Sequence, residues 1–153
     1  MSDVRAKLTE LGLTLPVAAK PVAAYVPAVR TGNLVFTAGQ LPMADGKLVK
    51  TGKVGADVTV EEAKELAQLC AINAIAAVET VVDVTKIVRV VRVVGYVNGA
   101  PGFNSHPAVV NGASELYLHI WGEAGKHARS AIGVAELPFD APVEVELTVE
   151  LAD

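Results

Sequence analysis

Cysteine, positive charge and long uncharged apolar runs are the features that this chain has least of. Its single cysteine, Cys70, allows neither an intrachain disulfide nor a cysteine-based metal cluster. The net charge is −4, whereas proteins dedicated to nucleic acids usually carry an excess of basic residues that contact phosphates. The charge argues against such a role, although it is compatible with a local basic patch.

Membrane and targeting signals are missing as well. Every stretch long enough to cross a bilayer contains charged or polar breaks, so no transmembrane helix is predicted. Residues 1–16 have neither the long apolar core nor the cleavage pattern of a secretory signal. We therefore expect a soluble cytoplasmic protein without a membrane partner.

Apolar residues, by contrast, make up 52% of the chain, and the mean hydropathy is +0.41. Most of the excess is valine and alanine, since aromatics account for only 5%. Either an oligomer covers part of this surface or both faces of a sheet are covered within the chain, and the oligomer is our preferred interpretation. The length predicts a single domain, residues 1–153, with a sizeable core.

Turn residues and hydrophobic periodicity predict the element order ββ(β)αβαββ after a short amphipathic helix. Thr59 and Glu62 form the pattern of a capping box, and Asn73, near the apolar stripe of the helix that follows, is expected to bond a backbone group. The expected ranges are a helix at 3–12, strands at 22–29, 34–39 and 47–50, a helix from 59 to about 78, a strand at 86–98 and a helix from 105 to about 121.

The segment 127–151 carries the most informative pattern of the chain. Strict alternation of valine or leucine with glutamate or threonine over 143–151 predicts a half-buried strand. A Leu-Pro break at 137–138 separates it from an earlier apolar run that starts near Arg129. We predict two antiparallel strands joined by a turn, with a cation at the start of one and Glu144 early in the next.

Arg129 and Glu144 are the candidate catalytic residues. A guanidinium in a cleft binds a carboxylate or a phosphate with two parallel hydrogen bonds, and a nearby glutamate can orient a water or accept its proton. Each also has a plainer interpretation, Arg129 as a surface or ion-paired arginine and Glu144 as one of several outward carboxylates on its strand. His127 lies two residues before Arg129 and could share its strand face.

Arg89 and Arg92 interrupt the apolar strand at 86–98. Because they are three residues apart, they are predicted to point to opposite faces, and pairing with a carboxylate is the expected role. The three histidines lack metal-ligand spacing, and the glycine and serine contexts match neither phosphate-binding loops nor nucleophile elbows. The residues thus indicate no metal and no organic cofactor.

Four segments in this order resemble the RidA/YjgF family, also called endoribonuclease L-PSP, over nearly the whole chain. The most specific is ARSAIGVAELPFDAPVEVE at 128–146, and the G-N-x-x-x-x-[AS]-G-Q-x-P pattern at 32–42 supports it. The other matching parts are YVPAVRTGNLVFTAGQLP at 25–42, which contains this pattern, the capped helix with Asn73, and VVNGASELY at 109–117.

The resemblance implies a chorismate-mutase-like α+β fold, in which a mixed sheet carries two helices on one face. It also implies a homotrimer with clefts between neighbouring subunits. Family members deaminate reactive 2-imino acids, and the enamines in equilibrium with them, to 2-oxo acids and ammonia without a cofactor. The implied ligand is therefore a small carboxylate metabolite, a 2-imino or 2-oxo acid.

The resemblance also assigns roles to individual positions. Arg129 matches the family's carboxylate-binding arginine, and Glu144 matches its water-positioning glutamate. Gly39, Tyr25 and Asn111 match further substrate-binding positions of the cleft.

Two positions depart from many deaminase members. Ala131 stands where they carry cysteine, and Ala38 stands where they carry serine, while His127 is a further candidate at the substrate site. With these side chains missing, a non-catalytic binder of small carboxylates is one alternative to a deaminase. A ribonuclease or translation inhibitor, as some members have been described, is the other, and the net charge of −4 argues against it.

Overall fold

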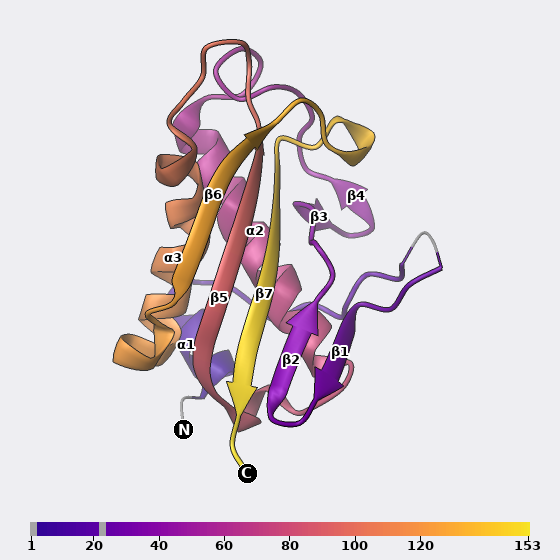
Figure 1. Ribbon diagram of the computed structural model, residues 1–153, viewed down its shortest axis with the longest axis vertical. Coiled ribbons are helices and arrows are strands. Elements are labelled where there is room, and N and C mark those ends of the chain that lie inside the picture. The colour runs from indigo at the N-terminus through magenta and orange to yellow at the C-terminus, as the bar shows by residue number, and fades with distance from the viewer. Residues whose placement is uncertain (1–2, 22–23) are drawn as a thin grey trace.

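Five strands form one mixed sheet, and two long helices cover one of its faces (Figure 1). In the computed structural model, which describes residues 3–21 and 24–153, the strand order is β1-β2-β7-β5-β6. Neighbouring strands are antiparallel except for β5 and β6, which are parallel. The expected α+β class, with a mixed sheet and two helices on one face, is confirmed.

The element order follows the prediction, with one extra short strand. The bounds are α1 (Val4–Glu10), β1 (Ala28–Thr31), β2 (Leu34–Thr37), β3 (Met43–Ala44), β4 (Lys47–Leu48), α2 (Val60–Glu79), β5 (Ile87–Asn98), α3 (His106–Trp121), β6 (Ala128–Val134) and β7 (Val143–Leu151). The strand expected at 22–29 begins only at Ala28, and its positions 22–23 lie outside the described residues.

Helix α2 starts where its capping signal places it. The Thr59 side chain accepts a hydrogen bond from the Glu62 backbone nitrogen at 3.1 Å, so half of the predicted capping box is present. The Glu62 side chain does not complete the box, because it pairs with Lys50. Asn73 donates to the carbonyls of Leu41 and Met43, both at 3.0 Å, which confirms its expected backbone partners.

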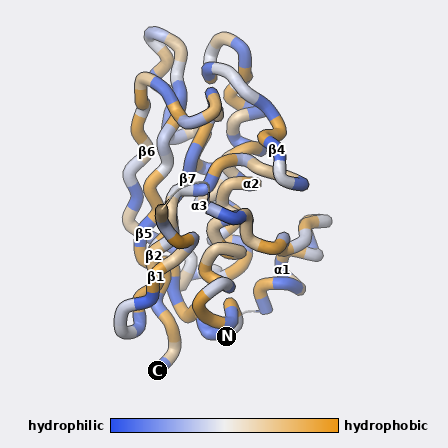
Figure 2. The backbone as a smooth tube through the Cα atoms, turned by 90° about the vertical axis from the view of Figure 1, so that its right-hand side faces the viewer, coloured by the Kyte–Doolittle hydropathy of each residue, from blue (hydrophilic) through white to orange (hydrophobic). Residues whose placement is uncertain are grey.

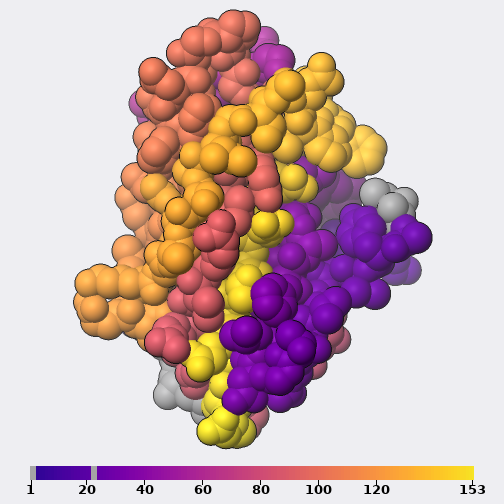
Figure 3. Space-filling model, in the orientation of Figure 1, coloured from indigo at the N-terminus to yellow at the C-terminus, as the bar shows by residue number. Residues whose placement is uncertain are grey.

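The two faces of the sheet differ completely in their surroundings. Alternate residues of β7 are buried against the helices, namely Val143, Val145, Leu147, Val149 and Leu151. Seen edge-on, all three α-helices lie on that side of the sheet, which we call the helix face (Figure 2). We call the other side the open face; Figure 3 looks onto it.

The pairing predicted for residues 127–151 is wrong. β6 and β7 run in opposite directions, but β5 lies between them and pairs with both. The chain reaches β6 through the α3 crossover, and residues 135–142 then carry it across to β7. Alternation of side chains identifies a strand and its buried face, but it holds no information on which strand lies beside it.

The prediction that Arg89 and Arg92 point to opposite faces is also wrong. In the register with β7, Arg89 stands opposite Glu150 and Arg92 opposite Thr148, so both arginines lie on the open face. The register shifts between Val90 and Arg92, which is the signature of a β-bulge. The expected carboxylate partner is confirmed for Arg89, whose Nη2 lies 2.6 Å from Glu150 Oε2.

Glycines set how closely the helices approach their neighbours. A side chain at Gly95 of β5 would collide with Val110 of α3, so the absence of a side chain there lets α3 lie close to the sheet. At Gly112, where α3 crosses α2, a methyl group would collide with the backbone carbonyl of Lys64.

None of the helices in residues 3–21 and 24–153 has the length and apolar character needed to cross a bilayer.

Gly112→Ala is expected to destabilise the fold. Alanine is about 1 kcal/mol better than glycine inside a helix, yet here the overpacking against backbone should outweigh that gain and cost about 1–3 kcal/mol. Chemical denaturation measures the change. Glu115→Ala, at an exposed position of the same helix, is the control and should stay within about 1 kcal/mol of the parent. A Gly112→Ala protein more stable than the parent would contradict the close crossing.

Candidate active site

Arg129 lies on the edge strand β6 with its side chain directed toward α3. In the parallel register it stands opposite Val93, which is fully buried on the helix face. Its Nη1 donates to Asn111 Oδ1 at 2.7 Å and to Ser114 Oγ at 3.2 Å. Asn111 and Ser114 share one face of α3 because they are three residues apart. The predicted cleft residues Arg129 and Asn111 are therefore in direct contact.

His127 extends this polar chain on the far side of Ser114. Its Nδ1 lies 2.6 Å from the Gly125 carbonyl oxygen, and its Nε2 lies 2.9 Å from Ser114 Oγ. Since a carbonyl can only accept, Nδ1 carries the proton, and in the neutral ring Nε2 accepts from the Ser114 hydroxyl. Burial, and to a smaller extent the charge of Arg129, lower the pKa of His127, although the bond to Gly125 acts in the opposite direction. The ring is therefore neutral near pH 7.

The polar chain orients the guanidinium and leaves part of it available. The hydrogen bonds that Arg129 makes within residues 3–21 and 24–153 all use Nη1. Its Nε and Nη2 can therefore still donate to a ligand, which is the edge that a carboxylate needs for two parallel hydrogen bonds. Ser114 was not among the predicted site residues, and its spacing of three from Asn111 is the signal that could have indicated it.

Glu144 lies on the open face of β7, opposite Tyr96 of β5. Its Oε1 would lie only 2.6 Å from a Cβ at Gly39, so a residue without a side chain is needed there to let the carboxylate rest on the backbone. Partial burial, and then the negative charge of Glu146, raise the pKa of Glu144 above its ordinary value. A raised pKa makes this carboxylate a stronger base once it is ionised.

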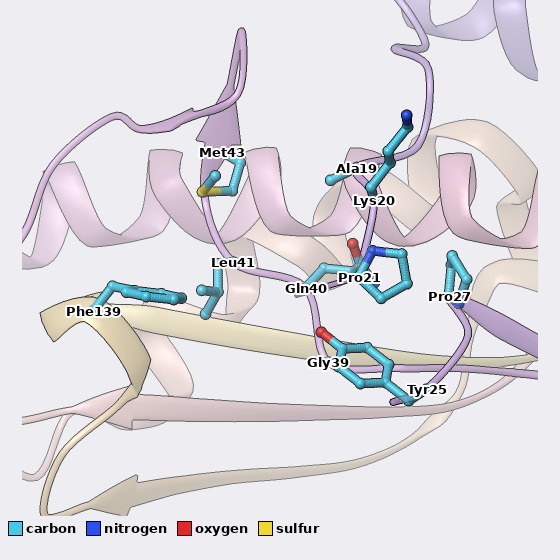
Figure 4. A pocket seen from close by; sticks show the side chains of 10 residues that line it. All are labelled: Ala19, Lys20, Pro21, Tyr25, Pro27, Gly39, Gln40, Leu41, Met43 and Phe139. Carbon is cyan, nitrogen blue, oxygen red and sulfur yellow. The ribbon is translucent and has the colours of Figure 1, made fainter. Parts of the chain in front are cut away.

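A cavity of about 90 Å³ opens beside Gly39. Tyr25 lines it at one end, Phe139 and Leu41 line it at the other, and Gly39 lies between them (Figure 4). The amino group of Lys20 points away from the cavity. The predicted residues Tyr25 and Gly39 thus belong to one hollow, and Glu144 borders it through its contact with Gly39.

The predicted site residues form two groups rather than one. Arg129, Asn111 and His127 cluster between β6 and α3, and Ala131 follows Arg129 on the same face of β6, opposite Gly95. Glu144, Gly39 and Tyr25 form the second group, at the open face.

The two groups cannot meet within one chain. Arg129 and Glu144 project from opposite faces of the sheet, and β5 separates their strands, which places the strands roughly 10 Å apart. A ligand held by Arg129 is therefore out of reach of Glu144 of the same chain.

Cys70 lies outside both groups. Its side chain is fully buried in α2, with the sulfur 3.7 Å from the Val143 carbonyl oxygen, and burial raises the pKa of the thiol well above its usual range. In the part of the chain that the structure describes, no three histidine, cysteine, aspartate or glutamate side chains are grouped closely enough to hold a metal ion.

Comparison with known proteins agrees with the resemblance seen in the sequence. The model of the family described as "YjgF/chorismate mutase-like, putative endoribonuclease" matches residues 5–151. Protein TCP17 of Trypanosoma cruzi is 43% identical over 150 residues, which are 97% of this chain and 94% of that protein. A 2-iminobutanoate/2-iminopropanoate deaminase of Dermatophagoides farinae is 30% identical over 137 residues, which are 90% of this chain and 93% of that protein.

The fold is likewise that of a solved relative. A crystal structure of a protein of unknown function from Agrobacterium tumefaciens superposes with a TM-score of 0.90 at 46% identity, covering 97% of this chain and 92% of that one. Because the family model spans nearly the whole sequence and both relatives align over at least nine-tenths of it, the chain belongs to the YjgF/RidA family and has its chorismate-mutase-like fold.

Proposed function

We propose that this protein hydrolyses small 2-imino acids to 2-oxo acids and ammonia in clefts between the subunits of a homotrimer. The observation that carries the proposal is the orientation of Arg129, which is held through Nη1 by α3 while Nε and Nη2 remain available for a carboxylate. The relative named as a 2-iminobutanoate/2-iminopropanoate deaminase supports this choice of reaction. The trimer follows from the family resemblance.

Two features of the sheet support a site shared between subunits. Arg129 and Glu144 face opposite sides of the sheet, so only a second copy can bring one to the other. The open face also exposes apolar side chains, with Val29 at 53%, Phe36 at 44% and Ile132 at 46% of their full exposure. A neighbouring subunit on this face would bury them, in line with the apolar excess of the composition.

The proposed reaction needs only the groups already described. Arg129 binds the substrate carboxylate and places the imine carbon, which is electrophilic when its nitrogen is protonated. Glu144 of the neighbouring copy orients a water and accepts its proton as the oxygen adds to that carbon. Glu144 then passes this proton to the nitrogen and takes the proton of the new hydroxyl group as the C=O bond forms and the C–N bond breaks. The 2-oxo acid leaves, and the released ammonia takes the last proton as ammonium. Neither a thiol at position 131 nor a hydroxyl at position 38 takes part, so Ala131 and Ala38 are compatible with this route.

RNA cleavage, which the family description names, fits this chain less well. A ribonuclease of this size needs a basic groove, whereas the net charge is −4 and Arg89 on the open face is paired with Glu150. Reversible binding of a 2-oxo acid without turnover uses the same Arg129 contact, and the rate and thermal stability of the parent protein distinguish it.

Arg129→Ala should reduce imine hydrolysis by about 30-fold or more, because losing a charged partner of a carboxylate in a partly dry cleft costs about 2–5 kcal/mol. A threonine dehydratase supplies 2-iminobutanoate, and 2-oxobutanoate formation is followed with and without the protein. Arg30→Ala, at the exposed β1–β2 hairpin, is the matched control and should keep the parent rate.

The same assay separates the alternatives. An unchanged rate in Arg129→Ala would remove Arg129 from the mechanism. A parent protein that gains thermal stability with 2-oxobutanoate but never accelerates its formation would be a binder. Degradation of an added RNA by the parent protein would favour the ribonuclease.

Mixing two inactive variants should restore activity if the site is shared. In trimers that contain both Arg129→Ala and Glu144→Gln subunits, about one third of the clefts would combine an intact arginine with an intact glutamate. The subunits are mixed by co-expression with different tags, and the doubly tagged species is assayed. Activity no higher than that of either variant alone would show that the two residues do not act across an interface.

Glu146→Gln should move the acid limb of the pH–rate profile to lower pH. Glu144 must be ionised to accept a proton from water, and the charge of Glu146 raises the pKa of Glu144, so removing that charge lowers this pKa. Tyr96 can still donate to the new amide oxygen, as it does to Glu146 Oε1 at 3.0 Å. Glu150→Gln, farther along the same face, should leave the limb in place; a limb that stays fixed in Glu146→Gln would exclude Glu144 as the base.

A further inference from the structure

Phe139 occupies an unusual position beside the cavity. It is 65% exposed, and both it and Asp140 have a φ of +57°. Two successive residues other than glycine in the left-handed region are rare, and such backbone persists only where the surroundings hold it. The exposed ring therefore results from a constrained loop and not from a relaxed one.

The contacts that hold this loop are made by Asp140, and the ring of Phe139 takes no part in them. The Gly52 backbone nitrogen donates to the Asp140 carbonyl oxygen at 2.9 Å, and Asn98 Nδ2 donates to Asp140 Oδ1 at 3.2 Å. Asn98 is only 1% exposed and accepts from Lys53 Nζ at 2.8 Å. The loop between β6 and β7 is thus fixed on the end of β5, and its geometry presents the ring of Phe139 to the cavity.

The cavity wall on the other side is equally well held. Leu41 and Met43 follow Gly39 along the chain. Their backbone is fixed to α2, because the Asn73 side chain donates to both of their carbonyls at 3.0 Å. Figure 4 shows the ring of Phe139 beside Leu41, with the Met43 side chain directed toward the same space. Together these three side chains form one apolar end of the hollow.

We propose that Phe139, Leu41 and Met43 bind the side chain of the substrate and make the protein selective for 2-imino acids with a branched or aromatic apolar side chain. This inference rests on the proposed function, because it places the reacting carbon at Glu144. From there the substrate's side chain extends over Gly39, which has no side chain to obstruct it, into the cavity.

The size and polarity of the cavity match such a group. A volume of about 90 Å³ exceeds several-fold the roughly 10–15 Å³ that one ordered water needs, so a methyl or ethyl group would leave part of the hollow unfilled. The cavity end formed by Phe139, Leu41 and Met43 offers no charged partner, so an ionised side chain would lose its hydration there without compensation. Branched and aromatic apolar groups gain most from this surface.

Selectivity among imines tests the inference. An L-amino-acid oxidase generates the imines of alanine and leucine, and kcat/KM is measured for each. The parent protein should favour the leucine-derived imine by about 10-fold or more, and Phe139→Asn should reduce that ratio by about 10-fold with little change for the alanine-derived imine. Asparagine tolerates a positive φ, so the loop should keep its shape. Phe139→Leu should keep most of the preference, and Leu118→Asn, which removes an exposed apolar side chain from α3, should keep all of it.

Titration of the same proteins with 2-oxopropanoate and 4-methyl-2-oxopentanoate separates failure of this inference from failure of the proposed function. If the parent hydrolyses imines and Phe139→Asn has the same leucine-to-alanine ratio of kcat/KM, the inference alone is overturned. It is also overturned alone if Phe139→Asn differs from the parent only in its oligomeric state. If no imine is hydrolysed, but the parent binds the larger 2-oxo acid more tightly and Phe139→Asn does not, the side-chain pocket is supported and the proposed reaction is excluded. Equal binding of both acids by the parent would overturn the pocket.

Discussion

The hydrogen bonds that join Arg129 on β6 to α3 are the constraint on which the proposed site depends. A long arginine side chain at a sheet edge would otherwise lose roughly 2 kcal/mol of rotamer entropy each time it bound a ligand. Asn111 and Ser114 restrict it through a single nitrogen and so keep its other donors available. The helix can lie this close to the sheet because Gly95 leaves room for Val110. The packing of α3 on the sheet therefore also determines the orientation of the Arg129 guanidinium.

The second half of the site depends on the open face of the sheet. There the carboxylate of Glu144 rests against the Gly39 backbone with a raised pKa, among side chains that one chain alone leaves partly exposed. An edge cation directed to the helix face and a carboxylate on the open face are incomplete as a catalytic pair in the monomer. In the proposed homotrimer, the helix-face edge of one subunit would lie against the open face of the next and complete the pair.

The loop between β6 and β7 connects selectivity to catalysis in the proposed scheme. It ends where the strand bearing Glu144 begins, and its left-handed residues Phe139 and Asp140 are held by contacts to the end of β5. A change in this loop alters the apolar wall of the cavity without touching Arg129. Relatives with the same cation and carboxylate could thus differ in the substrates that they accept.

Most of the strands and helices, the buried face of β7 and the family could be predicted from the sequence alone, and the residues proposed for the two half-sites come from the family resemblance. These follow from local periodicity, capping and motif spacing, which the chain carries in neighbouring positions. The folded structure was needed to show that β5 separates β6 from β7, that a bulge turns Arg89 and Arg92 to the same face, that Ser114 contacts Arg129, and that Phe139 lines the cavity. Strand neighbours, bulges and left-handed loops depend on contacts between residues far apart in the chain, and a side-chain pattern of period two is the same whichever neighbour a strand acquires.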